Sequence, residues 1–287
     1  MKHTTVAASD GYPLSAQTFG DAQAARAGVL IVPAMGVEQP YYVGFAHWLA
    51  ARGYFVVTFD YRGMGYSRRG SLRRLKADVL TWAEQDTAAM VTFLREHVDG
   101  KPLLWVGHSL GGQIFGLVPG HEQFKAMVTV AAGSGYWRDY APGLKRIAPL
   151  LWFVIVPVSI PLAGYFPGRA LRMIGDVPAG VMRQWRSWCL DAEYMFGVLP
   201  ARVREHYAAL SLPLLSLSFA DDEYLSERNI QLLHGFYAAA ARDMQRISPA
   251  DIGAPGIGHF GFFRKRFEAS LWPRAGDWLD RQVALHH

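Results

Sequence analysis

A serine in a glycine-rich turn is the residue of this sequence best suited to nucleophilic chemistry. Gly107, Ser109 and Gly111 form the pattern G-x-S-x-G, between the apolar stretch 102–107 and a helix that should begin at Ser109. In such a strand–turn–helix the serine takes a strained backbone conformation, and glycines two residues away leave room for the tight approach. This context predicts a nucleophile elbow with Ser109 as the nucleophile.

Two motifs resemble those of the α/β-hydrolase superfamily, close to its serine-aminopeptidase-like (S33-like) group. The elbow reads GHSLGG, and residues 60–67 (DYRGMGYS) are similar to the D-x-R-G-x-G-x-S loop of that group. The resemblance covers roughly residues 5–134 and 205–285. It implies a serine hydrolase in which the nucleophile, the acid and the histidine follow one another in this order along the chain.

The serine hydroxyl needs an adjacent base, and His259 fits this role. It lies in the segment GIGHFGFF, after a short strand and before the last helix. His234 falls in an amphipathic helix and is expected to pack or lie at the surface. His108 adjoins the nucleophile, but its side chain should point away from it. His286 and His287 are at the end of the chain.

The acid that orients the histidine should follow the strand expected at 213–219. Asp221, Asp222 and Glu223 all stand there. The family pattern at this turn aligns Asp222 with the acid, although Phe219 replaces the usual glycine. Asp221 and Glu223 remain alternatives, as does Asp139 elsewhere in the chain.

An oxyanion hole requires two backbone N–H donors. The residue directly after the nucleophile, Leu110, should supply one. The loop after the strand at 28–33 reads Pro33-Ala34-Met35-Gly36, and Met35 is the natural second donor. Relatives often carry His-Gly here, and the alternative is that Met35 only packs.

The elements that must position these residues follow an α/β pattern. Short alternating stretches at 4–9 and 14–20 predict an antiparallel hairpin. Strands and helices then alternate, which predicts a doubly wound, mostly parallel sheet. Strands are expected at 28–33, 54–59, 102–107, 124–132, 213–219 and 244–247, and helices at 40–52, 78–98, 226–240 and from 273.

Residues 135–205 break this alternation and are predicted to form an inserted helical cap between two core parts, 1–134 and 206–287. The segment is rich in aromatic residues, which favours a mostly apolar pocket over the nucleophile. We expect substrate contacts from Trp137, Trp185 and His108.

The cap also contains an uncharged stretch, 148–166, that is long enough to span a bilayer. Pro149, Pro157 and Pro161 disfavour a regular span, and a span would separate the two halves of one sheet. We therefore favour a buried cap helix, with a peripheral membrane contact as the alternative.

Composition limits the remaining possibilities. Hydrophobic residues make up 51% of the chain and charged residues 18%, which excludes a disordered chain. Cys189 is the only cysteine, so an internal disulfide and a cysteine-rich metal site are excluded. The net charge is +5, partly from basic clusters at 68–76 and 264–266, which could attract nucleic acid, anionic lipid or a phosphorylated substrate. We favour solvated loops, and no nucleic-acid-binding module accompanies them. The start of the chain lacks a secretory signal, and we expect a cytoplasmic protein.

The expected function is hydrolysis of an ester-like bond in a small to medium apolar acyl or aryl substrate, without cofactor or metal. A thioesterase, a peptidase or amidase, or an acyltransferase would use the same residues. A non-catalytic binding protein on the same fold is a further alternative. The sequence does not indicate an oligomeric state.

Overall fold

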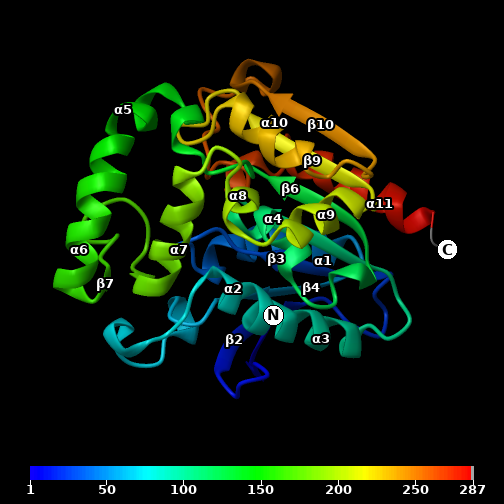
Figure 1. Cartoon of the computed structure of the whole chain (residues 1–287). Coiled ribbons are helices and arrows are strands. Elements are labelled where there is room, and N and C mark those ends of the chain that lie inside the picture. The colour runs from blue at the N-terminus through cyan, green and yellow to red at the C-terminus, as the bar shows by residue number, and fades with distance from the viewer. Residues whose placement is uncertain (286–287) are drawn as a thin grey trace.

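An eight-stranded sheet forms the centre of the computed structural model, which describes residues 1–285 (Figure 1). The strand order is β1-β2-β4-β3-β5-β6-β9-β10. β1 pairs with β2, and β2 with β4, in antiparallel fashion, whereas all other neighbours are parallel. The strands are β1 (Lys2–Ala7), β2 (Pro13–Phe19), β3 (Ala27–Val32), β4 (Tyr54–Phe59), β5 (Leu103–His108), β6 (Phe124–Val130), β9 (Leu214–Phe219) and β10 (Arg242–Ile247).

Helices cover both faces of this sheet, as expected for a doubly wound fold. The sequence of β3 is apolar throughout because both faces of the strand are buried: Leu30 and Val32 belong to one hydrophobic core, and Val29 and Ile31 to the other. The first core also contains residues of α2, α3, α4 and α10, and the second contains residues of α1 and α11. These helices are α1 (Val43–Ala51), α2 (Val79–Thr81), α3 (Ala88–His97), α4 (Leu110–Gln113), α10 (Glu227–Gly235) and α11 (Trp272–Ala284).

The chain direction across the sheet reverses between β3 and β5. From β3 the chain continues to β4 on one side, and later returns to β5 on the other side of β3. In open α/β sheets, ligands bind outside the carboxyl ends of the strands at such a switch point. Val32 pairs with Gly107, so the loop after β3 and the turn after β5 leave the sheet side by side.

The predicted elements are largely present, with differences in length. The strand predicted at 54–59 is β4, with the same bounds. The predicted helix 226–240 ends at residue 235, and the helix after Ser109 is only four residues long. The predicted helix 78–98 is interrupted by a π-helical segment, Trp82–Thr87, between α2 and α3.

Between β6 and β9 the chain leaves the sheet and forms helices and a two-stranded ribbon. The elements are α5 (Pro142–Leu150), α6 (Val156–Ala163), β7 (Tyr165–Phe166), β8 (Val177–Pro178), α7 (Ala179–Leu190), α8 (Met195–Val198) and α9 (Ala201–Ala209). α5 and α6 are joined by the π-helical segment Leu151–Ile155 into one helix, Pro142–Ala163, at the edge of the molecule away from the sheet (Figure 1). The boundaries 135–205 for a cap domain remain a prediction.

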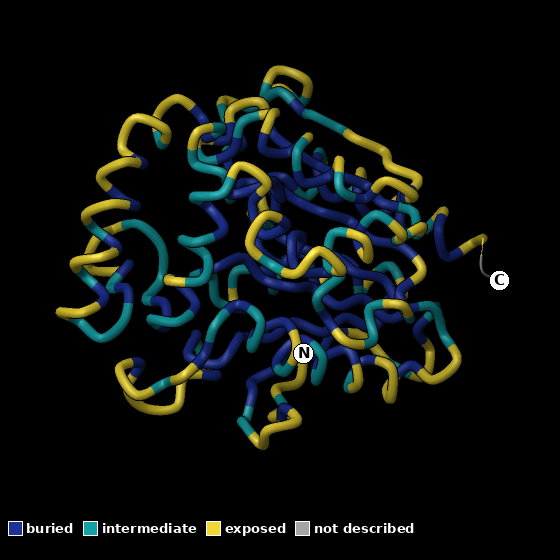
Figure 2. The backbone as a smooth tube through the Cα atoms, viewed as in Figure 1, coloured by how far each residue is buried: buried dark blue, intermediate teal, exposed yellow. Residues whose placement is uncertain are grey.

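The expectation of a buried cap helix at 148–166 is wrong. By length and composition the helix Pro142–Ala163 could cross a membrane: its most apolar 18-residue stretch has a mean hydropathy of 1.8, and only 28% of that stretch is buried. One side packs against the cap, and the other side is exposed (Figure 2). Because both sides are apolar, hydrophobic periodicity could not distinguish the buried side from the exposed one.

Candidate active site

Ser109 sits in a sharp turn between β5 and α4. Its backbone has φ 48° and ψ −113°, a conformation that costs a non-glycine residue free energy. The flanking glycines make the turn possible: a Cβ on Gly107 would lie 2.4 Å from the carbonyl oxygen of Gly111, and one on Gly111 would lie 2.1 Å from that of Val32. The local geometry is that of a nucleophile elbow.

His259 is paired with Asp222. Its Nδ1 lies 2.8 Å from Asp222 Oδ2, and the two side chains are 6% and 1% exposed. The other carboxylate oxygen, Oδ1, accepts hydrogen bonds from the backbone N–H groups of Tyr224 (2.8 Å) and Leu225 (2.9 Å). This carboxylate is therefore fixed, and it selects the imidazole tautomer with the proton on Nδ1. Nε2 is then left to accept a proton.

The neighbouring carboxylates hold the backbone of the same loop. Asp221 accepts hydrogen bonds from Ile257 N (2.7 Å) and Gly258 N (3.2 Å), and Glu223 accepts one from His259 N (2.9 Å). The structure thus brings Asp222, and neither Asp221 nor Glu223, to the imidazole. Asp139, the more distant alternative, pairs with Arg228.

Ser109 and His259 line one cavity at the carboxyl ends of the strands. No direct hydrogen bond joins their side chains in the described part of the chain. Catalytic hydrogen bonds in ligand-free sites are often longer than in the substrate complex. The arrangement is compatible with proton transfer from the serine to the histidine once a substrate is bound.

The two predicted oxyanion donors also lie at this cavity. Leu110 and Met35 both line it. Within residues 1–285, neither backbone N–H has a hydrogen-bond partner. Two hydrogen bonds hold the loop that carries Met35: Tyr61 Oη donates to Pro33 O (3.1 Å), and Ala34 N donates to Tyr42 Oη (2.9 Å). Two free amides at the switch point are what an oxyanion hole requires.

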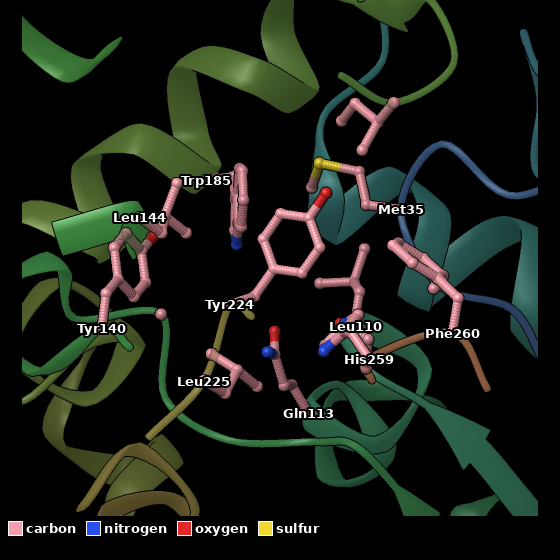
Figure 3. Close-up of a pocket in the computed structure, with 14 residues that line it drawn as sticks. Met35, Leu110, Gln113, Tyr140, Leu144, Trp185, Tyr224, Leu225, His259 and Phe260 are labelled. Carbon is pink, nitrogen blue, oxygen red and sulfur yellow. The ribbon is translucent and has the colours of Figure 1, made fainter. Parts of the chain in front are cut away.

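The cavity is small and mostly apolar. It encloses about 70 Å³, well below the roughly 300–1,000 Å³ of ordinary ligand pockets. Figure 3 shows the ring of Tyr224 between Trp185 on one side and Met35 and Leu110 on the other. The lining residues are Ala34, Met35, Ser109, Leu110, Gln113, Gly135, Tyr140, Leu144, Ile174, Trp185, Tyr224, Leu225, His259 and Phe260.

Two of the three predicted substrate-binding residues are not at this cavity. Trp185 lines it, whereas Trp137 and His108 do not. Trp137 packs edge-to-face on Phe153, with a ring separation of 6.0 Å, because the short helix that carries it lies against the long cap helix. His108 ends β5, and its side chain points into the core, where it is fully buried.

His108 belongs to a hydrogen-bond chain that the sequence did not reveal. Its Nδ1 lies 2.9 Å from Tyr42 Oη, and its Nε2 lies 3.2 Å from the carbonyl oxygen of His259. Since Tyr42 Oη accepts from Ala34 N, its own proton is available to Nδ1, and Nε2–H donates to His259. Burial lowers the pKa of His108 to about 3, so the ring is neutral. These hydrogen bonds link the loop that carries Met35 to the loop that carries His259.

The other candidate residues have structural roles. In the 60–67 motif, Asp60 is buried and accepts hydrogen bonds from Gln39 and Tyr66, and Ser67 donates to the Asp60 carbonyl, so both residues stabilise the turn. His234 is buried between Thr129 and Ile230. Burial raises the pKa of the Cys189 thiol. Within residues 1–285 no cluster of three potential metal ligands occurs, and His286 and His287 lie outside the described residues.

The fold and the elbow define an α/β hydrolase, and its nucleophile position is occupied by serine. The family model described as serine aminopeptidase, S33, matches residues 23–176, which is more than half of the chain. The protein therefore belongs to this family and is a serine hydrolase. No protein of curated function matches the sequence.

Solved structures share the whole fold at low sequence identity. A monoglyceride lipase from Saccharomyces cerevisiae superposes with a TM-score of 0.69 at 14% identity, covering 98% of this chain and 94% of the lipase. The monoacylglycerol lipase of Paleococcus ferrophilus gives 0.62 at 15%, with 94% and 99% covered. An esterase from Exiguobacterium antarcticum gives 0.59 at 15%, with 99% and 100% covered. At these identities the likeness establishes the fold.

Proposed function

We propose that the protein hydrolyses carboxylic esters with a small to medium apolar acyl or aryl group. The observation that carries the proposal is the convergence of Ser109 and the His259–Asp222 pair on one apolar cavity. The solved esterase and lipases of the same fold are named for ester hydrolysis, which is consistent with this proposal.

The proposed reaction has two steps. His259 Nε2 takes the proton of Ser109 as its Oγ attacks the ester carbonyl, and the Leu110 and Met35 amides stabilise the oxyanion. His259 then protonates the departing alcohol, leaving an acyl-serine. Water, deprotonated by His259, attacks the acyl-serine and releases the acid. Asp222 stabilises the imidazolium in both steps.

The cavity lining favours an ester over the amino-terminal peptide bond named in the family description. An aminopeptidase must bind the ammonium group of its substrate, and a carboxylate is the usual partner of a buried cation. Among the described residues that line the cavity there is no aspartate or glutamate. Neutral substrates therefore suit this site best. A cytoplasmic location and a small-molecule substrate remain our expectations.

A fluorophosphonate probe tests the nucleophile. We expect labelling of the wild-type protein, no labelling of Ser109→Ala, and normal labelling of Ser187→Ala, whose serine lies on α7 outside the cavity lining. An unlabelled wild-type protein would favour the non-catalytic binding protein.

A substrate panel then tests the reaction class. Aryl and alkyl esters are assayed beside coenzyme A thioesters and amides with the same acyl groups, with and without a small alcohol as acceptor. We expect the highest kcat/KM on the esters. Faster turnover of thioesters or amides, or an alcohol-dependent transfer product, would replace ester hydrolysis by that activity.

A further inference from the structure

The long cap helix Pro142–Ala163 carries an exposed apolar face. Half of the large apolar side chains that are exposed in residues 1–285 lie on this one helix. Their exposed fractions range from 48% for Val154 to 75% for Leu162. We call this surface the outer face; it consists of Ile147, Leu150, Phe153, Val154, Val158 and Leu162, with the exposed Pro149, Pro157 and Pro161 between them.

The outer face has no charged residue between Ile147 and Leu162. The opposite side of the helix is also apolar, and there Ala148, Trp152 and Ile160 are buried in the cap. A helix that is hydrophobic all round is ordinarily covered on all sides, by protein or by lipid. A contiguous apolar patch on a protein surface marks an interaction site. The outer face therefore needs an apolar partner.

Positive charge flanks the outer face at both ends. Lys145 and Arg146 are exposed near its first turn. At the other end, Arg73, Lys76 and Arg183 line an open groove of about 610 Å³, together with Ile160, Pro161 and Gly164 of the helix end. One carboxylate, Asp78, lies in this lining. The loop with Arg73 and Lys76 lies beside the lower end of α6 (Figure 1).

This arrangement fits an anionic phospholipid surface and disfavours a second copy of the chain. Lysines and arginines next to an apolar helix face bind phosphate headgroups while the apolar side chains enter the acyl region. In a twofold dimer through the outer face, an antiparallel helix pair would place Lys145 and Arg146 of one copy against the groove cations of the other. Like charges would then face each other, whereas a bilayer supplies the opposite charge.

We propose that the protein docks peripherally on anionic phospholipid bilayers through the outer face, with headgroups in the Arg73–Lys76–Arg183 groove. The helix does not cross the bilayer, because its inner side is packed in the cap and the chain returns from it to strands of one sheet. Leu144, on the first turns of the same helix, lines the Ser109 cavity, so docking holds the cavity close to the lipid surface.

Vesicle co-sedimentation of the full chain tests the docking. We expect binding to vesicles that contain phosphatidylglycerol, weaker binding to phosphatidylcholine alone, and release at high salt. The matched variants are Leu162→Glu and Leu285→Glu, because both leucines are 75% exposed and only Leu162 lies on the outer face. Leu162→Glu should lower vesicle binding about tenfold or more, and Leu285→Glu should leave it unchanged.

Charge reversal tests the groove separately. The double variant Arg73→Glu, Lys76→Glu should lose the preference for phosphatidylglycerol. The control is the double variant Arg95→Glu, Lys125→Glu, at two exposed positions away from the groove, which should keep this preference. Sedimentation measures docking without substrate turnover, so its result does not depend on the proposed ester hydrolysis. Fluorophosphonate labelling of Ser109 in each variant reports an intact fold.

Four results would overturn the proposal. The first is a wild-type protein that stays in the supernatant with anionic vesicles, and the second is an equal loss of vesicle binding in Leu162→Glu and Leu285→Glu. The third is a protein that stays in the membrane after an alkaline carbonate wash. The fourth is a dimer that Leu162→Glu dissociates without changing vesicle binding. The third would indicate a true membrane span, and the fourth a contact between copies.

Discussion

The Nε2 atom of His108 lies 3.2 Å from the carbonyl oxygen of His259, so the residue before the nucleophile holds the backbone of the proposed base. On its other side the same ring binds Tyr42, which in turn binds the amide next to Met35. A neutral, buried imidazole thus connects two loops that are far apart in the sequence. The positions of the proposed base and of the loop that carries Met35 are coupled through it.

Replacing Tyr42 by phenylalanine tests this coupling. The change leaves Ala34 N and His108 Nδ1 without their partner, and either loop can then shift. A displacement of about 1 Å in a reacting group costs about a hundredfold in rate. We expect kcat on a small ester to fall about tenfold to a hundredfold, with KM changed less than about threefold, in steady-state kinetics.

Tyr237→Phe is the matched control. Tyr237 is fully buried, and its hydroxyl has no hydrogen-bond partner among residues 1–285. Its removal should leave kcat unchanged. Unaltered kcat in a folded Tyr42→Phe protein would show that the hydrogen bonds of Tyr42 and His108 have only a structural role.

Asp222→Asn should almost abolish turnover. An asparagine can donate to Nδ1 and stabilise the wrong tautomer of His259, and it cannot stabilise the imidazolium. We expect kcat to fall about 10⁴-fold with the fold retained, measured by ester kinetics and circular dichroism. Asp221→Asn is the comparison, because Asp221 binds only backbone N–H groups of the His259 loop. Its loss should be far smaller, and equal losses would contradict the assignment of Asp222.

The sequence was sufficient where local chemistry decides the structure. The G-x-S-x-G pattern placed Ser109, since each glycine is required by a backbone contact within the turn or with β3. The bounds of β4 followed from an apolar run buried on both faces. The family pattern, and not local chemistry, distinguished Asp222 from the two acids beside it, and the structure places Asp222 at His259.

The sequence was insufficient where tertiary packing decides. Tyr42 and His108 are 66 positions apart, and their hydrogen bond depends on how α1 packs on the sheet. Aromatic content predicted an apolar pocket but not which rings face it, because the rotation of each cap segment is set by its neighbours. Trp185 therefore lines the cavity and Trp137 does not.

Gly111→Ala should destabilise the protein. Its Cβ would lie 2.1 Å from the Val32 carbonyl oxygen, so the elbow or β3 must move. Overpacking of this kind costs about 1–3 kcal/mol or more, and we expect a loss near the upper end in urea denaturation. Gly143→Ala is the control. It adds a methyl group to α5 with no atom within 4 Å, so it should be neutral or slightly stabilising. Equal effects of the two changes would contradict the close approach at the elbow.

Two buried histidines predict acid sensitivity of the fold. Burial lowers the pKa of His234 to about 4 and that of His108 to about 3. In the unfolded chain a histidine has a pKa of about 6.5. Below this pH the unfolded chain binds protons at these two residues, whereas the folded chain does not. The contribution of these histidines to the free energy of unfolding should therefore fall as pH decreases from about 6.5 toward 4, by up to about 1.4 kcal/mol per pH unit for each histidine.

His234→Gln separates this effect from other titrations. It removes one of the two buried imidazoles, so the unfolding free energy should fall less steeply with decreasing pH than in the wild type. His97→Gln, at an exposed position of α3, should leave the slope as in the wild type. A slope in His234→Gln equal to that of the wild type would show that other groups cause the acid sensitivity.

We expect Tyr224 to limit the size of the acyl group, because its ring lines a cavity of only about 70 Å³. Its backbone N–H, which binds Asp222, is retained when only the ring is removed. Tyr224→Ala should therefore raise kcat/KM for octanoyl relative to acetyl esters by about tenfold or more, since a longer chain gains apolar contact in the opened cavity. Trp137→Ala removes an aromatic ring of the cap away from the cavity and should leave the ratio unchanged. If Trp137→Ala shifts the preference and Tyr224→Ala does not, the substrate binds against a different wall of the cap.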